Sequence, residues 1–248
     1  MDLNNVKMRE FIYSLIDVKP AMSVLDLGCG TGYDLGRIAQ IVDEDSLLYG
    51  IDSMENSILR AKSQYHSDPR MKFTHDNIEG KLGFAGNSFD VVLSNNVLEC
   101  ITDKQSLIAE VHRVLKPNGQ AIFAHFDWDS QLIDGEDKEL VRRIVHTFSD
   151  WKQEWMSDID AWMGRRLWRT FQQSGLFRNG RIETYVLTNT EYSEPFYGYQ
   201  RIQDFGSLVK RNMISEDDYT RFLADIQQLA SGDGYFYSIN MYVYVGLK

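Results

Sequence analysis

The feature that most constrains this chain is a short apolar segment, Ser23–Leu27, that runs directly into the turn Gly28-Cys29-Gly30-Thr31-Gly32 and then into a helical pattern. A strand, alternating glycines and a helix open a βαβ unit, in which the missing Cβ atoms let the backbone turn tightly and approach a ligand. We therefore expect a parallel sheet that binds a ligand at the carboxyl end of this strand.

The rest of the first half repeats this alternation of strand and helix. Further short apolar strands are predicted at Leu47–Asp52, Met71–His75, Phe89–Ser94 and Gln120–Phe126. Helical patterns separate them, including one that Ser53 can cap and one over Asp103–Leu115. Strands that alternate with helices predict a doubly wound α/β sheet covered on both faces.

The second half is richer in helix and ends in an alternating segment. Helical patterns are predicted at residues 136–150, 159–174, 197–212 and 215–232. In Tyr235–Val245, Ile239, Met241 and Val243 alternate with polar or tyrosine side chains, which predicts a half-buried strand. Its simplest partner is an antiparallel strand over Arg181–Thr188.

Composition limits the classes of function. A chain of 248 residues suits one domain, and 26 basic against 36 acidic residues give a formal charge of −10, which disfavours nucleic acids and anionic membranes as partners. Cys29 and Cys100 are too few for a disulfide framework or a four-cysteine zinc site, and no metal is expected. No apolar run approaches the ~20 residues of a membrane span, and the N-terminal segment lacks the pattern of a signal peptide. We expect a cytoplasmic protein without a membrane partner.

Acidic and amide side chains follow successive strands of the predicted sheet. Asp26 precedes the glycine turn, and Asp52 ends the second strand. A carboxylate at the second of these places accepts hydrogen bonds from both hydroxyls of a ribose. Asp76 and Asn77 follow the third strand, where an adenine amino group can donate to a carboxylate, and Asn95 follows the fourth. Because the carboxyl ends of parallel strands meet at one edge, these residues predict a nucleoside-containing ligand.

A nicotinamide dinucleotide is the competing ligand. Its fingerprint is G-x-G-x-x-G, and here Tyr33 occupies the place of the third glycine. The carboxylate of Asp26 would also stand beside a pyrophosphate, which it repels, whereas the ammonium of an amino-acid moiety would suit it. A nicotinamide-dependent oxidoreductase and a non-catalytic protein that keeps the cofactor pocket are the two alternatives to the function inferred next.

Five blocks in order carry a resemblance to a known family. They are VLDLGCGTG, YGIDSMENSI, HDNIE, FDVVLSNNVLECITD and EVHRVLKPNGQAIF, spread over roughly residues 20–127. The chain resembles the class I S-adenosylmethionine-dependent methyltransferases, in the small-molecule subgroup that includes the ubiquinone- and menaquinone-biosynthesis enzymes. The resemblance implies transfer of a methyl group from S-adenosyl-L-methionine to an O, N or C atom of a small metabolite, by in-line displacement.

The same resemblance implies a fold and a division of the chain. The fold is a Rossmann-like, mostly parallel sheet of seven strands with an antiparallel last strand and a helical cap. Residues 1–248 are expected to form one methyltransferase domain. Within it, residues 1–127 bind the cofactor, residues from about 128 to 175 form a helical substrate cap, and residues 176–248 complete the sheet.

Residue roles are implied by the resemblance as well. Asp26 and the backbone of the glycine turn would hold the methionine end, Asp52 the ribose, and Asp76 with Asn77 the adenine edge. The full set of implied cofactor-binding residues is Asp26, Gly28, Cys29, Gly30, Gly32, Asp52, Ser53, Met54, Asp76, Asn77, Ile78 and Asn95.

The acceptor side is harder to read. His125 ends the fifth strand, where it either removes a proton from the acceptor or forms a local hydrogen bond that shapes the pocket. The five tryptophans, Trp128, Trp151, Trp155, Trp162 and Trp168, predict either an aromatic-lined pocket for a planar or amine acceptor or a cap packed on the sheet. The predicted substrate pocket comprises Glu99, Trp128, Trp162, Arg165 and Tyr197. Arg165 either binds a substrate carboxylate or phosphate there or is an exposed or Asp-paired arginine. Two cysteines are too few for an arsenic acceptor, and the oligomeric state is open, with a homodimer as one option.

Overall fold

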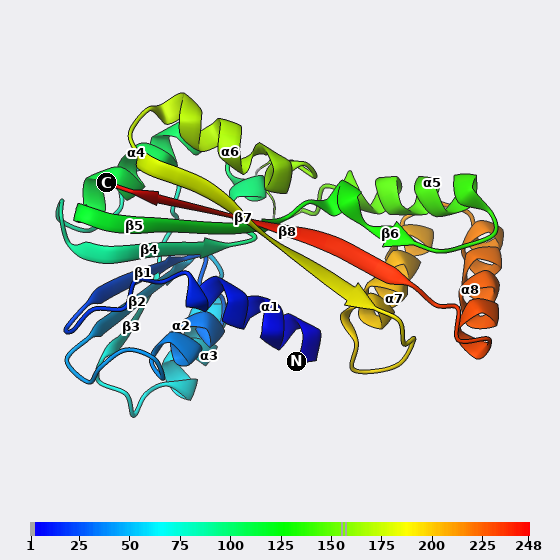
Figure 1. The fold of residues 1–248 in the computed structure, drawn as a ribbon, viewed down its shortest axis with the longest axis horizontal. Coiled ribbons are helices and arrows are strands. Elements are labelled where there is room, and N and C mark those ends of the chain that lie inside the picture. The colour runs from blue at the N-terminus through cyan, green and yellow to red at the C-terminus, as the bar shows by residue number, and fades with distance from the viewer. Residues whose placement is uncertain (1–2, 155, 157) are drawn as a thin grey trace.

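The computed structural model describes residues 3–154, 156 and 158–248. Its strands are β1 (Ser23–Leu27), β2 (Leu47–Asp52), β3 (Met71–His75), β4 (Phe89–Asn95), β5 (Leu115–Phe126), β6 (Leu132–Ile133), β7 (Arg178–Asn189) and β8 (Tyr237–Leu247). These described residues form one eight-stranded sheet in the order β3-β2-β1-β4-β5-β8-β6, with β7 along the other edge of β8 (Figure 1). β1 to β5 are mutually parallel, whereas β8 is antiparallel to β5, β6 and β7. The predicted mostly parallel sheet with an antiparallel last strand is confirmed, and the two-residue β6 is an addition to it.

The helices fall close to the predicted segments. They are α1 (Leu3–Ser14), α2 (Tyr33–Ile38), α3 (Glu55–Gln64), α4 (Lys104–Val114), α5 (Lys138–Ser149), α6 (Met163–Ser174), α7 (Tyr197–Lys210) and α8 (Glu216–Ser231), with short 3-10 turns η1 (Leu98–Cys100) and η2 (Trp128–Ser130). Asp103 and Ser215 cap α4 and α8 by accepting a hydrogen bond from the backbone three residues on. Ser53 does not cap α3, because Met54 holds the capping position.

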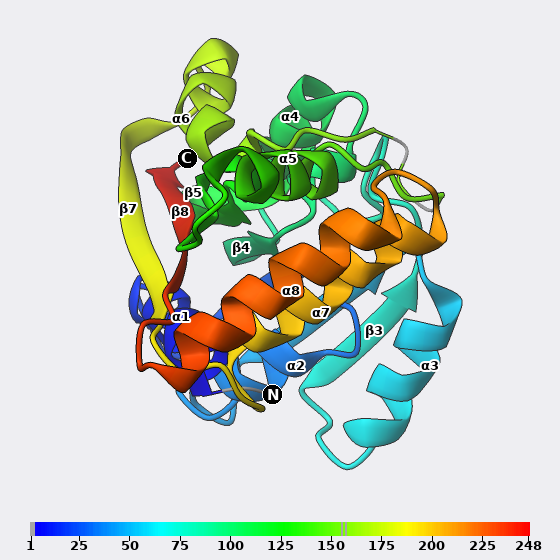
Figure 2. The same cartoon turned by 90° about the vertical axis from the view of Figure 1, so that its right-hand side faces the viewer.

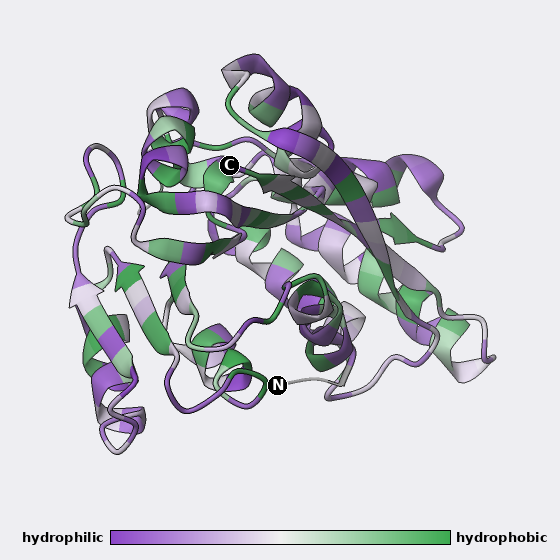
Figure 3. Cartoon of the chain, turned by 60° about the vertical axis from the view of Figure 1, so that its left-hand side comes forward, coloured by the Kyte–Doolittle hydropathy of each residue, from purple (hydrophilic) through white to green (hydrophobic). Residues whose placement is uncertain are grey.

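Two hydrophobic cores lie on opposite faces of the sheet. The first is covered by α1, α2 and α3 and continues beneath α5, α7 and α8, and the second is covered by α4 and α6 (Figure 1). Along β1, Val24 faces the first core while Leu25 and Leu27 face the second, as the alternation of a strand requires. Figure 3, coloured by hydropathy, shows that the helices contain both apolar and polar residues. Among the described helices, none combines the length and apolar character needed to cross a bilayer.

The two helices of residues 128–175, α5 and α6, pack in different parts of the fold. α6 lies on the sheet against β5 and β8 and beside α4. α5 instead lies with α7 and α8 beyond the carboxyl ends of the parallel strands, as Figure 2 shows from that side. The helices that stand over the carboxyl ends of the parallel strands are therefore α5, α7 and α8. α5 precedes β7 in the sequence, and α7 and α8 follow it.

The tryptophans behave differently from one another. Trp128 and Trp151 pack against the first core, whereas Trp162 and Trp168 are 42% and 45% exposed. These last two therefore do not pack a cap onto the sheet. α6 buries its 163, 167 and 171 side chains against the sheet, so position 168 faces away from it. Trp155 lies outside the described residues.

The contact of α6 with the sheet generates a stability prediction. The buried ring of Phe171 stacks on Tyr244 of β8, with ring centroids 3.9 Å apart. Phe171→Ala should lower the free energy of unfolding by about 3–5 kcal/mol, because it leaves a cavity under the helix. Urea denaturation followed by circular dichroism measures this, and Trp168→Ala on the exposed side should cost less than about 1 kcal/mol. Equal losses in the two variants would contradict the described packing of α6.

Candidate functional site

The glycine turn after β1 is held by the end of β2. The amides of Gly28 and Cys29 both donate to the carbonyl of Ile51, at 2.8 and 3.0 Å. Gly28, Gly30 and Gly32 all have positive φ, of 75°, 53° and 79°, which side chains with a Cβ rarely adopt. At Gly28 a Cβ would also lie 2.3 Å from a methyl group of Val97. The turn therefore depends on glycine both for its backbone angles and for its close contact with the segment after β4.

Asp52 ties the same turn to the end of β2. Its Oδ2 accepts a hydrogen bond from the amide of Gly30 at 2.8 Å, and its Oδ1 accepts one from the amide of Met54 at 2.7 Å. The carboxylate is thereby fixed at the carboxyl end of β2. Each carboxylate oxygen can accept more than one hydrogen bond, so both keep capacity for a ligand's hydroxyl groups.

A cavity of about 240 Å³ opens at this edge. Seven of the predicted cofactor-binding residues line it, namely Gly28, Asp52, Ser53, Met54, Asn77, Ile78 and Asn95. Five further lining residues are absent from the predicted set, Glu79, Asn96, Val97, Cys100 and Ile101. Each of these five lies inside or next to the HDNIE and SNNVLECI blocks, so the blocks themselves contained the signal.

The other five predicted cofactor residues lie around this cavity rather than in its wall. They are Asp26, Cys29, Gly30, Gly32 and Asp76. Cys29 points into the protein, because a Cβ on Gly50 would lie only 2.7 Å from its sulfur. Asp76 is exposed, and its Oδ1 accepts a hydrogen bond from the amide of Asn77 at 2.8 Å.

Asp26 is buried beneath the turn with one oxygen unused. It is 1% exposed, and its Oδ2 has no hydrogen-bond partner among the described residues. Burial, with the negative charge of Asp34, raises the pKa of Asp26 well above its usual value. Asp34 itself is paired with Arg9 and with the hydroxyl of Tyr13, so neither of these groups neutralises Asp26 directly. The site thus contains a carboxyl group that a ligand's ammonium would stabilise.

A second cavity, of about 180 Å³, lies under α5 and α7. It is lined by Glu99, Trp128, Phe148, Ser149, Trp151, Gln153, Met156, Ile159 and Arg201. The neighbouring η1 residues Glu99 and Cys100 line the second and the first cavity respectively, so η1 forms part of the wall between the two. Arg201 was not predicted from the sequence, because nothing in the local pattern of α7 distinguishes it from a surface arginine.

Glu99 connects His125 to the second cavity. Its Oε2 accepts a hydrogen bond from Nε1 of Trp128 at 2.6 Å and lies 3.9 Å from Nε2 of His125. The His125 ring is fully buried and lines neither cavity, and its Nδ1 lies 2.7 Å from the carbonyl of Phe126. In the part of the chain that the structure describes, its Nε2 has no hydrogen-bond partner. Burial raises the pKa of Glu99, the only one of this pair that reaches a cavity wall.

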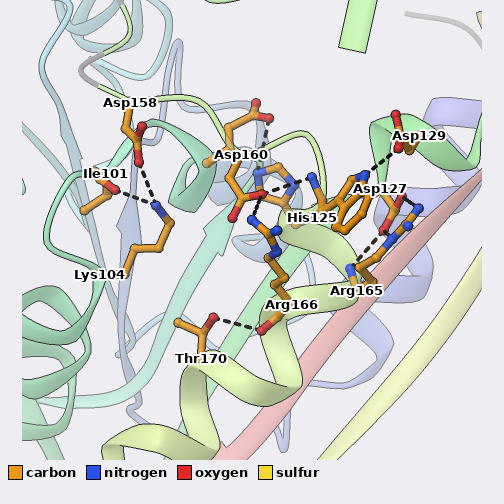
Figure 4. A network of polar contacts seen from close by, with 12 residues as sticks. Ile101, Lys104, His125, Asp127, Asp129, Asp158, Asp160, Arg165, Arg166 and Thr170 are labelled. Carbon is orange, nitrogen blue, oxygen red and sulfur yellow. Dashed lines mark hydrogen bonds and ion pairs between the residues drawn. The ribbon is translucent and has the colours of Figure 1, made fainter. Parts of the chain in front are cut away.

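The remaining three residues of the predicted substrate pocket do not line the second cavity. Arg165 is held in a bidentate ion pair by Asp127 (Figure 4). The indole of Trp162 donates to Asp129, and neither Arg165 nor Trp162 lines the second cavity. Tyr197 is buried behind the cavity wall, where its hydroxyl accepts a hydrogen bond from Arg201 at 3.0 Å. Asp127 and Asp129 thus bind Arg165 and Trp162, two of the residues predicted for the substrate pocket.

Comparison with known proteins identifies the family. Residues 18–191 match a family model described as a methyltransferase domain. The chain belongs to this methyltransferase family. The chain is 33% identical over 135 residues to a 37.1 kDa protein in transposon TN4556 of Streptomyces fradiae, and 35% identical over 129 residues to an arsenite methyltransferase of Aquipseudomonas alcaligenes. These matches cover 54% and 47% of the chain but only 39% and 37% of the two relatives.

Solved structures share the fold over nearly the whole chain. A putative methyltransferase from Bacillus halodurans has a TM-score of 0.64 at 14% identity, covering 98% of this chain and 99% of that one. Phosphoethanolamine N-methyltransferase 2 of Haemonchus contortus, in complex with S-adenosyl-L-methionine, has a TM-score of 0.58 at 18% identity, covering 98% of this chain and 52% of that one. At these identities the likeness concerns the fold, and the ubiquinone- and menaquinone-like subgroup stays a prediction.

The burial of Asp26 generates a prediction about pH. Because its folded pKa is raised, the folded state keeps a proton that the unfolded state loses above about pH 4, and stability falls as the pH rises from there through the folded pKa. Asp26→Asn should therefore flatten this decline and make the ligand-free protein more stable than wild type at pH 8. Urea denaturation at several values between pH 4 and 8 measures the effect. The exposed Asp45→Asn serves as the control, and an unchanged pH slope in Asp26→Asn would refute the assignment.

Proposed function

We propose that this protein transfers a methyl group from S-adenosyl-L-methionine to an O, N or C atom of a small metabolite. The observation that carries the proposal is the convergence of Asp52, Asn77 and Asn95 on one cavity beside the glycine turn. Membership of the methyltransferase family supports the same cofactor. The chain spans less than half of its first relatives, so the acceptor is inferred from the site and not from their names.

The residues at this edge fit that cofactor. The unpartnered Oδ2 of Asp26 offers an acceptor to the ammonium of the methionine end, next to the backbone of the glycine turn. Asp52, fixed by two amides, offers its carboxylate to the ribose hydroxyls. Asn95 contributes a buried Oδ1 that has no partner within the described ranges. We assign Asn77, with its neighbours Asp76 and Ile78, to the adenine edge and Ser53 with Met54 to the adenine face.

Positioning is the main contribution that the chain's own residues make. Bound S-adenosylmethionine supplies an activated methyl group on a sulfonium with a neutral leaving group. The protein has to fix the acceptor atom in line with that group and exclude water, which is worth as much as ~7–11 kcal/mol of the barrier. Removing a proton adds a factor of only ~10²–10⁴. A cofactor cavity with many polar contacts and an acceptor cavity with few suit this division.

The second cavity is the acceptor site in this proposal. It adjoins the cofactor cavity across η1, and Glu99 and Trp128 of the predicted substrate pocket line it. The His125 imidazole is available to an acceptor's proton only through Glu99, so we assign His125 a supporting place behind that carboxyl. An aromatic or amine-bearing acceptor, a homodimer, a biosynthetic role and a cytoplasmic location stay predictions.

Arsenite is a poor candidate for the acceptor. The chain has two thiols in separate places: Cys100 lines the cofactor cavity, and Cys29 is a buried residue of the glycine turn. Burial raises the pKa of Cys100 to about 12 and raises that of Cys29 as well. The thiolate is the form that binds soft metals and metalloids, so neither group offers a ready ligand to arsenic at neutral pH.

Equilibrium dialysis of the purified chain tests the cofactor, with S-adenosylmethionine, S-adenosylhomocysteine and NADH as the three ligands. The first two should bind and NADH should not. Incubation with methyl-labelled cofactor and pools of small hydroxyl, amine and carboxylate compounds then tests transfer. Binding of NADH alone would favour the oxidoreductase, and cofactor binding without transfer of label to any pool would favour a non-catalytic binding protein.

A substitution at Asp52 tests the ribose assignment. Asp52→Asn removes a charged acceptor and should weaken S-adenosylhomocysteine binding by about 1.5–3 kcal/mol, which is roughly 10- to 150-fold. Isothermal titration calorimetry measures the dissociation constant. Glu55→Gln, an exposed acid in the first turn of α3 that does not line the cavity, is the matched control. The ribose assignment is wrong if both variants bind like wild type.

A further inference from the structure

Arg201 is an arginine enclosed by aromatic rings at the wall of the second cavity. Its side chain is only 17% exposed, and its guanidinium carbon lies 5.2, 5.3 and 5.1 Å from the ring centroids of Trp128, Phe148 and Tyr197. A guanidinium keeps its charge at any pH at which the protein is folded. The cavity therefore has a permanent positive charge in its wall, in surroundings that are otherwise largely apolar.

The hydrogen bonds of Arg201 leave part of its capacity unused. Nη2 donates to the Tyr197 hydroxyl at 3.0 Å, and Nη1 lies 3.2 Å from a carboxylate oxygen of Asp204, whose side chain is 54% exposed. The Nε–H is enclosed and has no acceptor within residues 3–154, 156 and 158–248. One solvated carboxylate thus offsets the charge only partly, and one donor of the planar fork is unmatched.

Glu99 is the acidic side chain in the wall of the same cavity. Its Oε2 is already engaged by the indole of Trp128. Burial raises the pKa of Glu99, which favours its neutral form and reduces its repulsion of an anion. Ser149 and Gln153 add neutral polar groups to the wall. Among the described lining residues, Arg201 is the one with a permanent charge.

The size of the cavity limits what it can hold. Its volume of about 180 Å³ exceeds the ~150 Å³ of an apolar cavity that accommodates benzene. The rings of Trp128, Phe148 and Trp151 and the side chain of Met156 line it. A ligand of about one ring in size, with a flat apolar part, matches these walls.

We propose that the methyl acceptor is a molecule of about one ring in size that carries a carboxylate or a phosphate, and that Arg201 binds this anionic group. The inference rests on the proposed function, because it takes the second cavity as the acceptor site. With the anion at α7, the opposite end of the acceptor points to η1 and the cofactor cavity behind it. Arg201 is then a specificity-determining residue that holds the end of the acceptor remote from the reacting atom.

Four probes of similar size test the charge preference. Benzoate, phenyl phosphate, benzyl alcohol and benzylamine are titrated by calorimetry into the full chain saturated with S-adenosylhomocysteine. At least one of the two anions should bind ten-fold or more tightly than benzyl alcohol, and the better anion distinguishes carboxylate from phosphate recognition. Equal affinities for all four probes, or a preference for benzylamine, would overturn the proposal.

Variants connect the preference to one residue. Arg201→Met should abolish the preference for the anion, and Arg201→Lys should keep part of it, because lysine retains the charge without the fork. Arg211→Met is the matched control, since Arg211 follows α7 and lies 4.3 Å from the Trp151 ring without lining the cavity. A preference that survives in Arg201→Met, or that is lost equally in Arg211→Met, would overturn the proposal.

Binding of S-adenosylhomocysteine to each protein separates the two hypotheses. If wild type binds it and shows no anion preference, the inference about Arg201 fails while the proposed function stands. If wild type does not bind it, the proposed function fails. Should Arg201→Met not fold, the Nε–H resonance of Arg201 in wild type decides: a shift on addition of the preferred anion supports the contact, and an unshifted resonance overturns it.

Discussion

The site depends on the hydrogen bonds that fasten the glycine turn to the end of β2. The carbonyl of Ile51 accepts two amides of the turn, and the carboxylate of Asp52 accepts a third. Backbone amides donate all three bonds and a backbone carbonyl accepts two of them, so Asp52 is the one side chain among these three contacts. The same contacts fix the carboxylate that we assign to the ribose, so the fold of the turn and the placement of a binding group are one arrangement.

Two cavities lie at the carboxyl ends of the parallel strands, and η1 forms part of the wall between them. Polar residues at the ends of β2 and β4 dominate the first, while aromatic rings from η2, α5 and the segment after it dominate the second. A 3-10 turn brings consecutive side chains to different directions, so Glu99 and Cys100 reach different cavities. A short wall of this kind allows two ligands to meet at one point while different elements recognise them.

The sequence was informative where function and local pattern coincide. Asp52, Asn77 and Asn95 follow predicted strands directly, and all three line one cavity. It was uninformative where a side chain's role depends on distant partners. The sequence left open whether Arg165 binds a substrate or pairs with an acid, and Asp127 binds it. No prediction was made for Arg201, which rings from three elements enclose.

By itself, the sequence determined the order of strands and helices, the position of the glycine turn and the polar residues at the carboxyl ends of the parallel strands, because these follow from periodicities and spacings within a few residues. The tertiary structure alone decided which helices stand over that edge and which buried groups face each other. Glu99 and His125, 26 positions apart in the sequence, meet only because β4 and β5 are neighbours in the sheet. Such proximities depend on the packing of whole elements, and no local pattern encodes them.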